Sequence, residues 1–278
     1  MSTQMRNVLR QQLGELRHEP TAKRIRAELG GRTVVDSTRA LLVWEPRRVV
    51  PVYAVPVEDV AVELEPADGA GAPADDSVGL SLPEMSARPV LDPSIRFTVH
   101  SSEGRPVRLR AGGAAAHGFR PADPDLTGHV LLDFDGFDGW YEEDERIVSH
   151  PRDPFHRVDV RSSTRHVVVE LDGRVLAEST RPRLLFETLL PTRYYLPAED
   201  VTAELVPSAT RTACAYKGEA SYWTVRAGDV VAEDVAWSYQ RPLPDAAEIA
   251  GLVAFFDERL DLVVDGVRRE RPRTPWSR

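Results

Sequence analysis

The sequence predicts a mainly β protein with a few helices, built as two tandem compact β-rich domains. An internal repeat carries the first part of this prediction: residues 29–45 (LGGRTVVDSTRALLVWE) match residues 171–187 (LDGRVLAESTRPRLLFE) at eight of 17 positions. After a one-residue slip, residues 53–66 match residues 194–207 at eight of 14 positions. Because the matched blocks lie far more than about 50 residues apart, they indicate a duplicated domain rather than a solenoid.

Turn signals between β-branched runs carry the second part. Gly30-Gly31 and Asp172-Gly173 stand at the same place in the two copies, between runs rich in valine and leucine. Such dipeptides favour a two-residue type I′ hairpin, because both central residues need a positive φ. Residues 221–233 predict a further hairpin around Gly228-Asp229, and residues 184–186 and 203–206 predict short strands.

Composition excludes several classes of protein. The chain has 278 residues, 28% charged and 42% hydrophobic, with a net charge of −9. This balance argues against a general nucleic-acid surface or an anionic-membrane surface. One cysteine excludes an internal disulfide and any multi-cysteine metal site. No apolar run long enough for a membrane span and no secretory signal are present, so we expect a cytoplasmic protein.

The repeat divides the chain into four parts. Residues 1–20 are expected to form an N-terminal helix, 21–140 the first and divergent copy, 141–160 a connecting strap, and 161–278 the second copy. Within the first copy, residues 66–90 are rich in Ala, Pro, Gly and Asp and predict a flexible insertion.

Two segments show helical spacing. Near the start, an apolar stripe predicts a helix packed on the body, or alternatively a partner-binding helix; it comprises Met5, Val8, Leu9, Leu13 and Leu16. Near the end, Asp245 and Glu248 have the spacing of a capping box. The apolar residues that follow fall on one helical face and predict a second helix: Ile249, Leu252, Val253, Phe256 and Leu260.

Residues kept in both copies are best explained by the shared fold. They include the pairs Ser37/Ser179, Arg39/Arg181, Glu45/Glu187 and Asp59/Asp200. A fainter echo aligns residues 116–119 with 236–239. Glu187 directly follows an apolar strand, so its carboxylate is expected either to cap a strand end through backbone hydrogen bonds or to serve as a pocket acid.

Residues 210–223 (TRTACAYKGEASYW) have no counterpart in the first copy. Lys217 stands between an aromatic residue and a glycine, and apolar surroundings would lower its pKa. Lys217 would then act as a base, a nucleophile or an anion clamp, unless it is an ordinary surface lysine beside a turn. Cys214 is expected to be a small buried hydrophobe, with a nucleophilic thiol as the alternative.

Other clusters carry weaker signals. Residues 133–145 hold seven acids but depart from the calcium-loop pattern, which predicts a solvated acidic face. His150 and His156, with Asp153 between them, have ligand chemistry suited to a metal, although two prolines favour an ordered strap. Phosphate-binding glycine loops and the nucleophile elbow are absent. The residues therefore predict no metal site and no cofactor.

The second copy resembles a known family. Its pattern GRVLAEST, LLFETLLPTRYYLPAEDV, TACAYKGEASYW and AEDVAWSYQRPLPDAAEIAGLVAFFDERLD is similar to the domain of unknown function 427 family. Some members are catalogued as nucleotidyltransferase-like, and the two-copy arrangement resembles that of bacterial members. The resemblance implies a compact Mss4-like or β-tent-like fold for each domain. It implies no reaction for the motif positions, which include Glu187, Arg193, Tyr195, Asp200, Cys214, Lys217, Trp223 and Trp237.

These observations lead to a specific expectation and two rivals. We expect one small-molecule pocket in the second copy, with Lys217, Glu187 and Asp200 as acid–base groups if the pocket catalyses. The ligand-binding residues would be Arg193, Tyr195, Cys214, Tyr222, Trp223 and Trp237. The alternative is a non-catalytic protein-interaction module. Nucleotidyl transfer is least favoured, because the second copy has no paired carboxylates to hold a metal.

Overall fold

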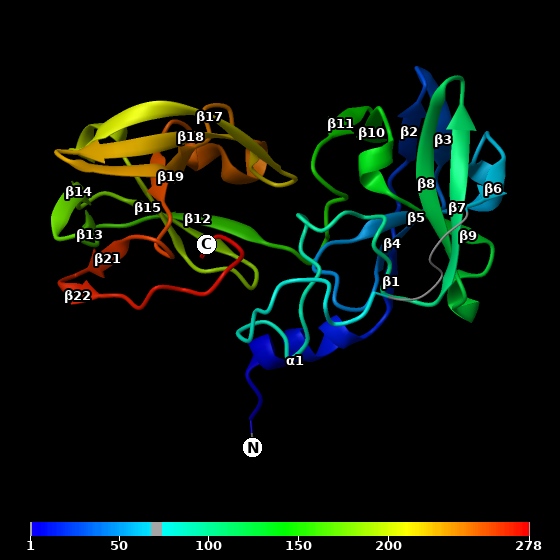
Figure 1. Cartoon of the computed structure of the whole chain (residues 1–278), viewed down its shortest axis with the longest axis horizontal. Helices are drawn as coiled ribbons and strands as arrows, with labels where there is room; N and C mark the ends of the chain where they lie inside the picture. Colours follow the sequence, from blue (N-terminus) through cyan, green and yellow to red (C-terminus); the bar gives the residue numbers. More distant parts are fainter. Residues whose placement is uncertain (1, 68–73, 278) are drawn as a thin grey trace. The chain divides into compact units, whose positions relative to one another are not determined.

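The computed structural model describes residues 2–67 and 74–277, and it is mainly β, as predicted (Figure 1). The chain divides into two compact units, residues 1–153 and 154–278. Each unit contains one seven-stranded and one four-stranded antiparallel sheet. We call these units the first and the second domain.

The first domain has the following strands. Its larger sheet has the order β1 (Arg17–Pro20), β4 (Leu41–Trp44), β5 (Val52–Pro56), β9 (His129–Leu132), β8 (Ala114–Pro121), β7 (Gly104–Ala111) and β6 (Leu64–Pro66). Its smaller sheet has the order β11 (Glu145–Ile147), β10 (Gly139–Glu142), β2 (Ile25–Leu29) and β3 (Arg32–Ser37).

The second domain repeats this order strand for strand. Its larger sheet runs β12 (Val158–Ser162), β15 (Arg183–Glu187), β16 (Arg193–Leu196), β20 (Val253–Phe255), β19 (Val230–Ser238), β18 (Gly218–Ala227) and β17 (Glu204–Cys214). Its smaller sheet comprises β14 (Arg174–Ser179), β13 (Val167–Leu171), β21 (Asp261–Val264) and β22 (Val267–Arg268). The two domains are therefore tandem copies of one topology.

The predicted hairpins are confirmed. Gly30 and Gly31 have φ of 62° and 74°, and Asp172 and Gly173 have φ of 50° and 76°. Both positive values are what a type I′ turn requires. The turn at 228–229 likewise joins β18 to β19 through a two-residue loop.

Strand register corrects one detail of the repeat. Ala54 and Tyr195 occupy equivalent positions, and their ladder partners are Leu131 and Ala254. Leu131 pairs on its other side with Phe119, and Ala254 pairs with Trp237. Phe119 is therefore equivalent to Trp237, two positions away from the alignment that the faint echo suggested, because hydrogen bonding rather than local similarity sets the register.

Each larger sheet buries both faces. One face packs against the smaller sheet in clusters that include Tyr53 and Trp140 in the first domain and Val169 and Phe255 in the second. The other face, which we call the outer face, carries its own apolar cluster. In the first domain this cluster includes Val43, Ala54, Phe97, Phe119 and Leu131; in the second it includes Leu185, Tyr195, Trp237, Ala254 and Phe256.

The helix predicted near the end of the chain is wrong. The structure has a 3₁₀ helix, η6 (Pro244–Ile249), followed by β20. Gly251 separates them with a φ of 70°, a left-handed value that interrupts a helix. In β20, Val253 and Phe255 face the smaller sheet, whereas Ala254 and Phe256 lie on the outer face. Alternation along a strand thus explains why Val253 and Phe256 are both apolar, although their spacing also fits one face of a helix.

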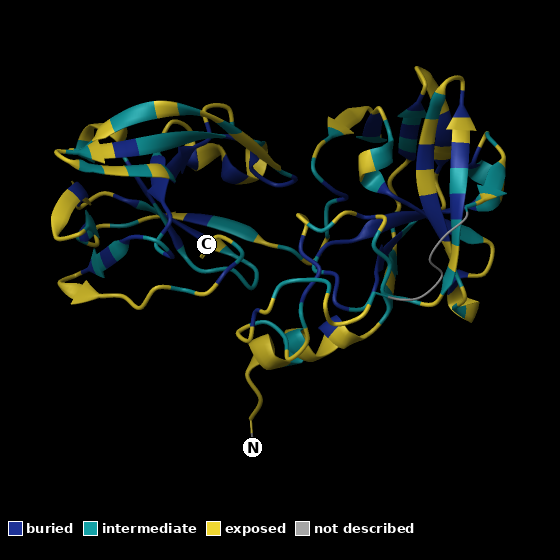
Figure 2. Cartoon of the chain, in the orientation of Figure 1, coloured by how far each residue is buried: buried dark blue, intermediate teal, exposed yellow. Residues whose placement is uncertain are grey.

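The N-terminal helix is shorter than predicted. Helix α1 spans Met5–Gln11, the 3₁₀ helix η1 spans Gln12–Gly14, and β1 already begins at Arg17. No residue of α1 is buried, and Met5 is 69% exposed (Figure 2). Leu13 is the member of the predicted stripe that is buried. The stripe therefore covers little of the domain surface.

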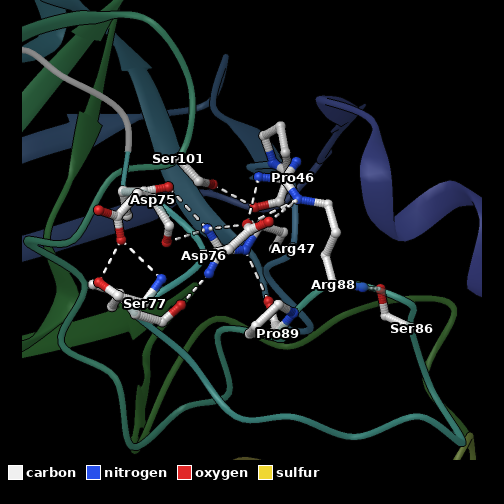
Figure 3. A network of polar contacts seen from close by, with 11 residues as sticks. Pro46, Arg47, Asp75, Asp76, Ser77, Ser86, Arg88, Pro89 and Ser101 are labelled. Carbon is white, nitrogen blue, oxygen red and sulfur yellow. Dashed lines mark hydrogen bonds and ion pairs between the residues drawn. The ribbon is translucent and has the colours of Figure 1, made fainter.

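The insertion is packed where the structure describes it. Residues 68–73 of the predicted flexible stretch lie outside the described residues. From residue 74 onward, the chain wraps around the buried guanidinium of Arg47, which donates to the carbonyls of Ala74, Asp75, Val78 and Pro89 (Figure 3). The next residue, Arg48, donates to three carbonyls of the segment that follows the insertion, those of residues 95, 96 and 99. Arg47 thus orders this loop together with a small apolar cluster of Leu13, Leu82 and Val90.

Candidate functional site

Glu187 is the centre of a buried charged cluster in the second domain. It is the last residue of β15, and its carboxylate accepts a hydrogen bond from His156 Nε2 at 3.0 Å and one from Lys217 Nζ. Burial alone would raise the pKa of Glu187, but the charge of Lys217 and the hydrogen bond from His156 lower it to about 2. Glu187 is therefore an anion held by two donors. No backbone N–H of the described residues donates to this carboxylate.

Lys217 reaches Glu187 from a tight hairpin. Cys214 of β17 pairs with Gly218 of β18, so residues 215–217 form a buried tip. Gly218 has a φ of 92°, which favours glycine and reverses the chain directly after Lys217. The sequence predicted a lowered pKa for Lys217, and this is wrong. Burial lowers the pKa, but the Glu187 carboxylate outweighs burial and raises it above its usual value. Lys217 is a fixed ammonium ion.

His156 is placed by strand pairing. Val158 of β12 lies opposite Glu187 in the ladder, so the residue two positions earlier arrives beside the end of β15. Its ring stacks on Tyr216 with 4.3 Å between centroids. The side chain of His156 is 19% exposed, against 11% for Lys217 and 6% for Glu187. His156 is thus the most accessible member of the cluster.

Aromatic residues line the outer face next to this cluster. Tyr195 is buried and its hydroxyl accepts a hydrogen bond from Trp237 Nε1 at 3.1 Å. Burial raises the pKa of Tyr195 to about 12, and burial raises the pKa of Tyr239 as well. Both phenols are therefore neutral hydrogen-bonding groups. Tyr222 belongs to the same apolar cluster, and its hydroxyl lies 3.0 Å from that of Thr212.

Arg193 is not free to clamp an anion. Its guanidinium donates to Glu258 at 2.8 and 2.5 Å and also to Asp257. It lies between 5.4 and 5.9 Å from the ring centroids of Trp237, Phe256 and Trp276. The paired carboxylates raise its pKa although burial opposes this. Arg193 is a neutralised cation inside an aromatic cluster on the outer face.

Asp200 and Trp223 lie apart from this cluster. Asp200 accepts hydrogen bonds from Arg181 Nη2 at 3.0 Å and from Ser179 Oγ at 2.6 Å. Asp59 makes the corresponding contacts with Ser37 and Arg39 in the first domain, so this arrangement belongs to the shared fold. Trp223 packs in the core between the two sheets of the second domain. Of the predicted residues, the cluster therefore gathers Glu187, Lys217, Tyr195 and, along the outer face, Arg193, Tyr222 and Trp237.

Cys214 is half-buried and carries a free thiol. Its position at the end of β17 puts it within electrostatic reach of Lys217, since a negative charge on Cys214 would raise the pKa of that lysine. The expectation of a fully buried residue is therefore not met.

The first domain holds a related pair at the same strand position. Glu45 follows β4 as Glu187 ends β15, and Glu45 Oε2 lies 2.9 Å from His100 Nδ1. His100 stacks on Phe119 with 4.0 Å between centroids. Its Nε2 lies 3.6 Å from Asp133, whose two carboxylate oxygens have no hydrogen-bond partner among the described residues. Burial raises the pKa of Asp133 to about 6.

The two domains differ in what surrounds the shared glutamate. Strand register places Val52 and Ala54 of the first domain where the second has Arg193 and Tyr195. The insertion begins after Pro66, at the point where the second domain instead continues its hairpin to Lys217. The glutamate and a histidine are thus common to both copies, whereas the lysine and the polar outer face belong to the second.

The histidines were the members that sequence reasoning missed. The sequence indicated His156 only as a possible metal ligand, and it gave no indication for His100. Neither lies in the matched repeat blocks, so comparing the copies could not reveal them. The pairing of β12 with β15 brings His156 to Glu187, and no pattern in the sequence indicated that pairing.

Three further features of the described residues bear on the site. A depression with room for about one water molecule, about 10 Å³, is lined by Val169, Tyr194, Phe255, Asp257, Leu260, Asp261 and Leu262; it lies on the side of the sheet opposite Tyr195. Over residues 2–67 and 74–277, no three His, Cys, Asp or Glu side chains gather closely enough to hold a metal ion. Those residues also contain no helix suited to crossing a bilayer.

Fold and site together define a tandem protein of two β-rich domains, each with a buried glutamate–histidine pair at a strand end. A family model described as a domain of unknown function (DUF427) matches residues 17–70 and 159–266. These ranges cover more than half of the chain and fall in both copies, so the chain belongs to this family. No curated protein matches the chain.

Proposed function

We propose that the second domain binds a small molecule beside the end of β15 and that His156 is its acid–base group. The observation that carries the proposal is the geometry of Glu187, an ionised carboxylate that accepts from His156 Nε2 at 3.0 Å. An ionised carboxylate only accepts hydrogen bonds, so Nε2 carries the proton and the lone pair of neutral His156 is on Nδ1. A carboxylate that fixes the tautomer of a histidine in this way is the usual support of a general base.

Accessibility supports the same assignment. His156 is the most exposed member of the cluster, and no hydrogen bond to its Nδ1 occurs among the described residues. A ligand that approaches Nδ1 therefore meets a group able to accept a proton and to return it. Lys217 lies beside that path as the ion-pair partner of Glu187, so it balances the charge of the carboxylate that orients His156.

The comparison between domains supports placing the function in the second. Glu45 and Glu187 both hold a histidine, but His100 has a carboxylate near each ring nitrogen, whereas His156 has one carboxylate partner among the described residues. His100 is thus enclosed by acids, and His156 keeps one nitrogen for a ligand. Among the described residues of the first domain, no lysine approaches Glu45; the backbone N–H groups of Ser101 and Ser102 donate to it instead, at 3.1 Å each.

Thermal-shift screening against a metabolite library tests the proposal with two matched variants. His156→Gln removes the titratable ring but keeps a donor for Glu187. His166→Gln is the control, because His166 forms an exposed pair with Glu178 in the same domain at 2.7 Å. A ligand present at 100 times its dissociation constant stabilises the wild type by about 2.7 kcal/mol. We expect this shift to persist in His166→Gln and to shrink in His156→Gln.

Two results would count against the proposal. If compounds stabilise both variants equally, the ligand binds elsewhere. If no compound stabilises the folded wild-type protein, a role in protein interaction becomes the better hypothesis, and pull-down experiments should follow.

A further inference from the structure

The last described residues form a compact turn of their own. Thr274 N donates to Ser277 Oγ at 2.9 Å, and Trp276 N donates to Thr274 Oγ1 at 3.2 Å. Ser277 N closes the turn by donating to Thr274 O at 3.2 Å. The family match ends at residue 266, so this segment lies after the matched region.

This turn lies on the outer face of the second domain. The Trp276 ring is 5.4 Å from Arg193 Cζ and 6.3 Å from the ring of Phe256. Thr274 Oγ1 donates to Glu258, the same carboxylate that binds Arg193. Within the described part of the chain, this is the one hydrogen bond that joins residues 274–277 to the body of the domain. The segment is therefore attached by one hydrogen bond and one ring.

The first domain contains a similar contact between an aromatic ring and a guanidinium, but there the ring is fully buried. There, Phe97, which follows the insertion, lies 5.2 Å from the guanidinium of Arg48 and is only 2% exposed. Trp276 makes a comparable contact with Arg193, but it is 39% exposed. Phe97 is part of a core, whereas Trp276 keeps more than a third of its surface exposed to solvent.

The surface beneath Trp276 favours planar rings. Arg193 presents a flat guanidinium between the rings of Trp237 and Phe256, and guanidinium planes stack on aromatic faces. Asp257 and Glu258 already neutralise its charge. We therefore expect the shape and polarisability of a ligand's ring to determine its affinity for this surface more than its net charge does.

We propose that residues 274–277 are a removable cap and that a planar aromatic group replaces Trp276 on Arg193. The inference rests on the proposed ligand-binding function of the second domain and names the ligand class for its outer face. In the capped state the indole of Trp276 occupies the position of that group. Ligand binding and closure of the cap then exclude each other.

Fluorine NMR with 5-fluoroindole as the probe tests this inference on the full chain. We expect Trp276→Ala to bind the probe about tenfold more tightly than the wild type, because the competing ring is gone. A synthetic peptide with the sequence of residues 270–278 should displace the probe from Trp276→Ala. Trp276→Phe retains a ring and should bind the probe as weakly as the wild type. Phe186→Ala is the control, since Phe186 is 41% exposed in the same domain, and its probe affinity should not change.

Equal probe binding by the wild type and Trp276→Ala would overturn the cap. So would a peptide that fails to compete. Trp276→Phe also serves as the test if the alanine variant does not fold. If Trp276→Phe binds the probe more tightly than the wild type and the peptide does not displace the probe, the ring is not the competitor. A metabolite whose stabilisation depends on His156 but not on Trp276 would leave the proposed function intact and refute only the cap.

Discussion

Asp133 is a buried carboxyl whose charge should make the first domain sensitive to pH. Burial raises its pKa from 3.8 to about 6, with His100, His117 and Arg48 opposing and Glu45 adding to the effect. The folded domain therefore binds this proton more tightly than the unfolded chain. The stability that Asp133 contributes is present at low pH and is lost as the pH rises through 6. At about 1.4 kcal/mol per pH unit, the carboxylate costs up to about 3 kcal/mol.

Asp133→Asn tests this directly, because it removes the charge and keeps the shape. We expect the variant to be more stable than the wild type at pH 8 and to lose this advantage by pH 5, measured by urea unfolding at each pH. Asp125→Asn is the control: this exposed residue should give no pH-dependent difference. A constant difference between wild type and Asp133→Asn across the range would contradict the prediction.

The Glu187–Lys217 pair should behave as one unit. Glu187→Gln strands a buried ammonium, which we expect to destabilise the second domain by about 3–5 kcal/mol. The double variant Glu187→Gln/Lys217→Met should cost clearly less than the two single changes combined, because neither charge is left unpaired. Urea unfolding at pH 7 measures all three.

An exposed ion pair serves as the comparison for Glu187 and Lys217, and the pH dependence of stability gives a second test. Arg110 and Glu65 form an exposed pair at 3.0 Å whose coupling should be below about 1 kcal/mol. Because the pKa of Glu187 lies at about 2, its contribution is present above pH 4.5 and is lost as the pH falls towards 2. Additive single changes, or acid sensitivity that survives in Glu187→Gln, would show that the pair is not coupled.

At the scale of elements, the insertion depends on Arg47. One guanidinium supplies donors to four carbonyls, and a planar fork is needed to reach them (Figure 3). Arg47→Lys keeps the charge but not this geometry. We expect faster cleavage after the exposed Glu84 by a glutamate-specific protease in that variant, with the rest of the domain intact by mass spectrometry. Arg110→Lys, at an exposed position, should leave the cleavage rate unchanged; equal rates in both variants would reject the role of Arg47.

The segment that contains β20 was predicted as a helix because its apolar spacing fits both a helix and a strand. The spacing of Ile249, Val253 and Phe256 is compatible with a helix, and the spacing of Val253 and Phe255 is compatible with a strand. Pairing of β20 with β16 and β19 buries both faces of this segment and decides for the strand. Gly251, with its positive φ, was the local signal against a continuous helix.

At the scale of the whole molecule, the two domains should be separable. The Glu187 cluster, its aromatic outer face and the residue 274–277 cap all lie within residues 154–278. We therefore expect a fragment of these residues to fold and to retain any ligand found for the full chain. Circular dichroism and calorimetry on the fragment measure this. An unfolded fragment, or a folded one that has lost the ligand, would show that the first domain is needed.

The sequence by itself determined the tandem β-rich architecture and the family. Repeats, glycine turns and β-branched runs can be read directly from the sequence, and both domains have the strands and hairpins that these features predict. The sequence also indicated Glu187 and Lys217, because one is shared between copies and the other is not. Only the tertiary structure decided their chemistry. Strand pairing brought His156 to Glu187, a carboxylate reversed the expected pKa change of Lys217, and two acids neutralised Arg193. Protonation and charge depend on neighbours distant in sequence, which no single-chain pattern specifies.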